Sequence, residues 1–100
     1  MKKIRVFCNM GMSTSVLVKN MNKAAEEMGY EVDIKANSVG LVKKEGADAD
    51  IVLLGPQIAY ELKKVQKELP EKPVFVIETR DYGMMDGKKV IEFVRGELDS

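Results

Sequence analysis

Four short segments with strand character, each followed by a connecting stretch of its own, constrain the fold of this chain more than any other feature. They occupy residues 4–8, 31–35, 51–54 and 74–77. Segment 51–54 is continuously apolar, which is typical of a central parallel strand covered on both faces. Segment 31–35 alternates apolar and charged residues, so we expect it at a sheet edge. Strands that alternate with helices predict an α/β chain whose parallel strands are joined by right-handed crossovers.

Three of the connecting stretches carry clear helix signals. The first helix is expected to begin near Ser13 and to stop at Gly29, which stands where a C-terminal capping glycine would. The second is expected to have Pro56 at its first position and to end at Pro70. Asp86 is the expected N-cap of the last helix. Apolar residues at helical spacing define the buried faces of these helices: Leu17, Met21, Ala24 and Met28; Ile58, Leu62, Val65 and Leu69; Val90, Ile91, Val94 and Leu98.

The rest of the connecting sequence is less regular. A short helix ended by Gly46 is predicted within residues 37–49, and residues 78–85 are predicted to form a loop. Together the elements favour a flavodoxin-like fold, with a four-stranded parallel sheet in the order 2-1-3-4 and helices on both faces. A length of 100 residues fits one domain spanning residues 1–100.

Composition removes several classes of site and partner. The chain has no histidine and one cysteine, which excludes Ser-His-Asp and Cys-His catalysis, histidine metal ligation and intramolecular disulfides. We therefore expect neither a metal site nor a cofactor. Sixteen basic and sixteen acidic residues cancel, which argues against nucleic acid as the main partner. The N-terminal apolar run is too short for a signal peptide or a membrane span, so we expect a cytoplasmic protein.

The carboxyl ends of the predicted strands mark the place where a ligand would bind. Three loops are expected to meet there, beginning at Cys8, Gly55 and Glu78. The loop after Cys8 runs directly into a helix, and backbone N–H groups at such a junction bind anions. That field favours a thiolate, so the loop could present a nucleophilic sulfur and hold a phosphoryl group on it. Equally, Cys8 could be a small buried strand residue without a chemical role.

Known anion-binding loops differ from this one. A dinucleotide loop has three glycines where this chain has only Gly11, and the Gly-Lys-Ser/Thr close of a P-loop is missing. A cysteine-dependent phosphatase loop, C-x5-R, would place its phosphoryl-stabilising arginine where Thr14 stands. Neither Asp81 nor Asp86 is followed by proline, unlike the acid of low-molecular-weight phosphatases. A redox-sensing cysteine would need a resolving cysteine, which the chain lacks.

Three segments together resemble a known family. Residues 8–15 read C-N-M-G-M-S-T-S, residues 49–60 read A-D-I-V-L-L-G-P-Q-I-A-Y, and residues 82–87 contain Y-G and D-G. The combination is similar to lactose/cellobiose-type enzyme IIB, the cytoplasmic B component of the bacterial sugar phosphotransferase system, over nearly the whole chain. One departure is visible, since Asn9 and Met10 stand where the family usually has small residues.

The resemblance implies a phosphocarrier with a phosphatase-type phosphate loop. The neutral composition gives no sign of a large assembly, so we expect a monomer. Cys8 would accept a phosphoryl group from a phosphohistidine of the IIA component. It would then pass the group to a sugar, cellobiose or a related β-disaccharide, held by the membrane IIC component. Backbone N–H groups from about Met10 to Ser15 would cradle the phosphate, assisted by the hydroxyls of Ser13, Thr14 and Ser15. The alternative function is that of a low-molecular-weight cysteine phosphatase-like hydrolase. The full loop comprises Asn9, Met10, Gly11, Met12, Ser13, Thr14 and Ser15.

Three further features each allow two interpretations. Gln57 either donates a hydrogen bond to the phosphate or the donor protein, or is a polar residue in the first turn of a helix. Tyr82 either borders the site or is an exposed loop aromatic. Four methionines on loops either form an adaptable docking rim or fold back into the core: Met10, Met12, Met84 and Met85.

Overall fold

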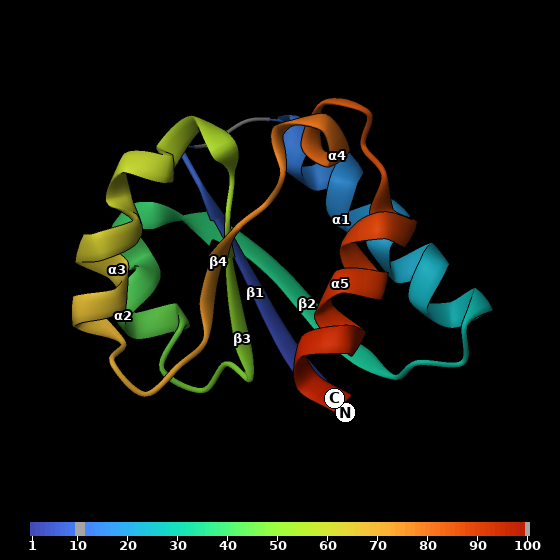
Figure 1. Ribbon diagram of the computed structural model, residues 1–100, viewed down its shortest axis with the longest axis horizontal. Helices are drawn as coiled ribbons and strands as arrows, with labels where there is room; N and C mark the ends of the chain where they lie inside the picture. Colours follow the sequence, from blue (N-terminus) through green and yellow to red (C-terminus); the bar gives the residue numbers. More distant parts are fainter. Residues whose placement is uncertain (10–11, 100) are drawn as a thin grey trace.

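The computed structural model describes residues 1–9 and 12–99, and it places a parallel sheet between two layers of helices (Figure 1). The sheet has the order β2-β1-β3-β4, and all three strand pairings are parallel. The predicted strand order is therefore confirmed. The strands are β1 (Lys2–Cys8), β2 (Val32–Ser38), β3 (Ile51–Leu54) and β4 (Val74–Val76).

Helices cover both faces of the sheet, as predicted (Figure 1). Successive side chains of a strand point to opposite faces, so β1 serves both layers. Ile4 and Val6 join the core beneath one pair of helices, whereas Phe7 joins the core beneath the other pair; all three are fully buried. The first pair is α1 (Met12–Glu27) and α5 (Gly87–Asp99), and the second is α2 (Val42–Glu45) and α3 (Leu62–Glu68).

The predicted end signals of the long helices are confirmed. Gly29 takes a positive φ of 66°, and the amide of Tyr30 donates to the carbonyl of Ala25 over 2.8 Å, which closes α1 in a Schellman motif. At the other helix, the Oδ1 atom of Asp86 accepts a hydrogen bond from the amide of Lys89 over 3.0 Å. Asp86 is therefore the N-cap of α5.

Three segments differ from the prediction. Strand β2 continues three residues further than expected, because it stays paired with β1 until Ser38 lies opposite Cys8. The predicted second helix begins as a 3-10 segment, η2 (Pro56–Glu61), in which Ile58 has the non-helical angles φ −117° and ψ 28°. The predicted loop after β4 contains a short helix, α4 (Thr79–Gly83). Its position decides the surroundings of the site described below.

The irregular connection between β2 and β3 contains the short helix that was predicted. It consists of a 3-10 turn, η1 (Val39–Leu41), continued by α2, and Gly46 is the C-cap. Across residues 1–9 and 12–99, none of the helices has both the length and the apolar character that crossing a bilayer requires.

Candidate active site

The carboxyl ends of β1, β3 and β4 meet at one end of the sheet. The amide of Gly55 donates to the carbonyl of Phe7 over 2.9 Å, and the amide of Ile77 donates to the carbonyl of Leu54, also over 2.9 Å. The chain therefore leaves the sheet at neighbouring points after Cys8, at Gly55 and after Ile77. This is the grouping of three loops that the strand order predicted.

Gly55 is the point around which three predicted site residues gather. A methyl group built on Gly55 would lie 2.8 Å from Oε1 of Gln57, 3.6 Å from Cβ of Cys8 and 3.6 Å from Cε2 of Tyr82. The absence of a side chain at Gly55 lets Gln57 approach the backbone this closely. The tertiary structure thus places residues from all three loops within one small volume, which supports the interpretations of Gln57 and Tyr82 as site neighbours.

Cys8 ends β1, and its side chain is buried, with 5% of its surface exposed. The exposed Asn9 follows, and Met10 and Gly11 lie outside the described residues. Helix α1 begins at Met12, with no acidic residue in its first turn. The unsatisfied N–H groups and the positive dipole end of α1 therefore follow Cys8 closely in the chain. Of the predicted phosphate loop, the structure therefore describes Asn9 at one end and the backbone from Met12 onward at the other.

Thr14 and Tyr82 form a buried pair that the sequence did not indicate. The Oγ1 atom of Thr14 lies 2.7 Å from the hydroxyl oxygen of Tyr82, although the two residues are 68 positions apart. Thr14 is 2% exposed and Tyr82 is 6% exposed. The interpretation of Tyr82 as an exposed loop aromatic is therefore wrong. The physical reason is that residues 79–83 form α4, which turns the ring inward toward α1 and Gly55.

The same pair bears on the phosphatase comparison. Thr14 occupies the place of the arginine in a C-x5-R loop, and its hydroxyl is engaged with Tyr82. An arginine at this buried position would have to displace the Tyr82 ring or leave the site. Asp81 and Asp86, the two residues compared above with the acid of a phosphatase, are also placed differently. Asp86 caps α5, and Asp81 faces a separate cavity. The described residues therefore do not favour a hydrolase.

The proposed methionine rim is only partly compatible with the structure. Met84 is 71% exposed, in agreement with a contact surface. Met85 instead packs against the core between α1 and α5, so its assignment to the rim is wrong. Its backbone takes a positive φ of 53°, between the end of α4 at Gly83 and the start of α5 at Gly87. Met10 lies outside the described residues, as does the side chain of Met12.

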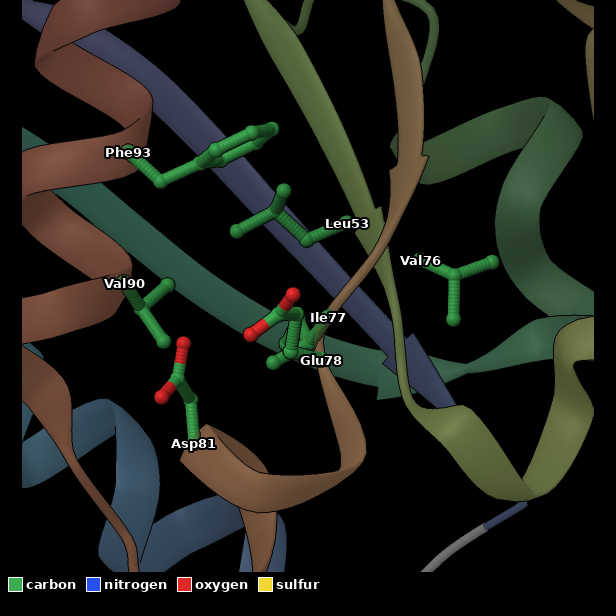
Figure 2. Close-up of a pocket in the computed structure, with 7 residues that line it drawn as sticks. All are labelled: Leu53, Val76, Ile77, Glu78, Asp81, Val90 and Phe93. Carbon is green, nitrogen blue, oxygen red and sulfur yellow. The ribbon is translucent and has the colours of Figure 1, made fainter.

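A cavity of about 290 Å³ lies between β4, α4 and α5. Figure 2 shows the carboxylates of Glu78 and Asp81 turned toward it, and Leu53 and Val90 are among the apolar residues that line it. A cavity bordered by two carboxylates repels phosphate, so this cavity does not suit an anionic ligand. In the part of the chain that the structure describes, no three His, Cys, Asp or Glu side chains are grouped to hold a metal ion.

Comparison with known proteins identifies relatives that match most of this chain. The chain is 43% identical over 94 residues to the oligo-beta-mannoside-specific EIIB component of the phosphotransferase system (PTS) of Bacillus subtilis, covering 92% of this chain and 91% of that protein. Two EIIB components of Lactococcus lactis, one galactose-specific and one cellobiose-specific, are 42% and 41% identical over 97 residues, each match covering 90% of both chains. The lactose-specific EIICB component of Staphylococcus epidermidis is 28% identical, and the match covers 97% of this chain but 17% of that protein.

Solved structures and a family model agree with these relatives. The cellobiose-specific IIB component of Borrelia burgdorferi superposes with a TM-score of 0.81 at 30% identity, covering 98% of this chain and 92% of that one. The lactose-specific IIB domain of Streptococcus pneumoniae shares the fold, with a TM-score of 0.83 at 16% identity and 95% coverage of both chains. The family model described as "PTS system, Lactose/Cellobiose specific IIB subunit" matches residues 3–93. This chain belongs to the lactose/cellobiose-specific IIB subunits of the phosphotransferase system and is a phosphotransferase component.

Proposed function

We propose that Cys8 is the phosphoryl-carrying residue of this IIB subunit. In the first step the Cys8 sulfur attacks the phosphorus of a phosphohistidine on a IIA component. The S–P bond forms as the N–P bond breaks, and the proton given up by the thiol ends on the imidazole that leaves. In the second step a sugar hydroxyl attacks the phosphorus, the S–P bond breaks and the thiolate is released, while the hydroxyl proton passes to a base. One observation carries the proposal: within a chain matched to the family over residues 3–93, Cys8 ends β1 and α1 begins four positions later, at Met12.

The loop after Cys8 would hold the transferred group. Its backbone N–H groups, from Met10 to Ser15, are proposed to cradle the phosphate, with the hydroxyls of Ser13 and Ser15 assisting. The hydroxyl of Thr14 is bonded to Tyr82, so we assign it a supporting place instead of a direct one. Gln57, close to Gly55 at the rim, is proposed to donate a hydrogen bond to the phosphate or to the donor protein.

The partners and the sugar are proposed on the evidence of the relatives. EIICB components contain a IIB-like part within a longer chain, which supports a membrane IIC component as the acceptor side. We therefore propose that the chain, a single domain over residues 1–100 and a monomer, acts at the cytoplasmic face of the membrane. We propose cellobiose or a related β-disaccharide as the sugar. Relatives of near-equal identity are named for three different sugars, which favours selection of the sugar mainly by IIC.

The test is intact-mass spectrometry after incubation with phosphoenolpyruvate, the general phosphotransferase proteins and a IIA component. We expect one phosphoryl adduct on the wild-type chain and none on the Cys8→Ser variant. An adduct that persists in Cys8→Ser would place the phosphoryl group on another residue. Absence of any adduct, together with turnover of an aryl phosphate, would favour the hydrolase and refute the carrier assignment.

A further inference from the structure

We infer that Tyr82 is a positioning residue for phosphoryl transfer. Its hydroxyl binds Thr14 and so holds the first turn of α1 in the orientation in which its N–H groups face a phosphoryl group on Cys8. The inference rests on the proposed phosphocarrier function and deepens it, because it names the contact that would keep the phosphate loop in its productive conformation.

The geometry of the pair is that of a strong, protected contact. The two hydroxyl oxygens are 2.7 Å apart, at the most common distance for hydrogen-bonded hydroxyl groups. Both residues are more than nine-tenths buried. Within residues 1–9 and 12–99, neither hydroxyl has a second hydrogen-bond partner. Since water cannot replace a lost partner easily at such a depth, each hydroxyl depends on the other.

The place of the pair in the fold links it to the chemistry. Thr14 is the third residue of α1, in the turn whose N–H groups lack partners within the helix. Tyr82 belongs to α4, and its ring lies beside Gly55, which also has Cys8 as a neighbour. The Tyr82 side chain thus connects the start of α1 to the loop at Gly55, which borders Cys8. Donors held in place before the reaction stabilise a transferring phosphoryl group better than donors that must reorganise.

A purely structural hydrogen bond would have the same geometry, so the experiment must separate stability from transfer. Three variants do so: Tyr82→Phe, Thr14→Val and the double variant. Each single change leaves one buried hydroxyl without its partner and should lower stability, whereas the double variant leaves none and should recover most of it. Tyr60→Phe is the matched control, because Tyr60 is 78% exposed and loses only a solvated hydroxyl.

Two measurements on each variant follow the active site. The first is the rate of phosphoryl transfer from a saturating IIA component to Cys8, and the second is the ³¹P chemical shift of the phosphocysteine. We expect transfer to fall about tenfold in both single variants and in the double variant, since the loss of oriented donors is not repaired by the second substitution. The ³¹P signal should shift in the same three variants and stay in place in Tyr60→Phe.

The outcomes separate this inference from the function on which it rests. A double variant that regains both stability and wild-type transfer would show a merely structural bond and overturn the inference. Unchanged transfer and an unchanged ³¹P signal in all variants would overturn it as well, while the wild-type phosphocysteine would uphold the carrier function. A wild-type chain that forms no phosphocysteine would overturn both.

Discussion

The contact between α1 and α5 yields a prediction whose size follows from the structure. A methyl group on Gly87 would lie 2.3 Å from the backbone carbon of Asn20 and 2.4 Å from the backbone nitrogen of Met21. Backbone atoms cannot rotate away, so Gly87→Ala would force the two helices apart by about 1 Å. A gap of about that size removes up to about half of the dispersion energy of each contact between them. Overpacking of this kind costs about 3 kcal/mol of unfolding free energy.

Urea unfolding followed by circular dichroism at 222 nm measures this loss. The control is Gly96→Ala in the same helix, where the added methyl meets no atom within 4 Å. That variant should gain about 0.5–1 kcal/mol, because alanine favours a helix interior over glycine. In thermal scans, about 3 kcal/mol corresponds to a fall in Tm of at least about 12 °C for a domain of this size. A Gly87→Ala variant within about 1 kcal/mol of wild type would refute the argument from close helix contact.

Three further predictions concern the caps, the site and the dependence on pH. Asp86→Ala should lower the unfolding free energy by about 1 kcal/mol in urea titrations, since it removes the N-cap of α5, and an unchanged midpoint would contradict that role. Gly55→Ala should leave the fold intact but displace the Gln57 amide, which lies 2.8 Å from the new methyl; transfer to Cys8 as fast as in wild type would argue against a role of Gln57 in the site. Burial, and then the Asp99 carboxylate, raise the pKa of Tyr30 in the folded state. The folded chain therefore holds that proton more tightly than the unfolded chain, and stability present below about pH 10 should be lost as pH rises above it. Tyr30→Phe should make this loss smaller in unfolding titrations between about pH 8 and pH 11, and an equal loss in both proteins would contradict the assignment.

Local spacing is sufficient to predict the framework of this protein. Strand and helix periods follow from backbone geometry, so the four strands, their order and the two long helices with their end residues can be recognised in the sequence alone. The position of Cys8 at the junction of β1 and α1 is a consequence of the same periodicity. The three segments that resemble the IIB family are continuous in the chain, which is why they too can be recognised without tertiary contacts.

The contacts around the site were decided only by the tertiary structure. Helix α4 is five residues long, too short for a periodic pattern to reveal, and it alone turns Tyr82 from the surface to the interior. Arg5 is likewise buried, and it donates a hydrogen bond to the carbonyl of Asp33 over 2.8 Å. The sequence pattern of a strand does not predict this, because a charged residue is usually exposed. The bond between Tyr82 and Thr14 joins residues 68 positions apart. Such a contact depends on how separate loops converge at one end of the sheet, and a convergence in space leaves no period in the sequence.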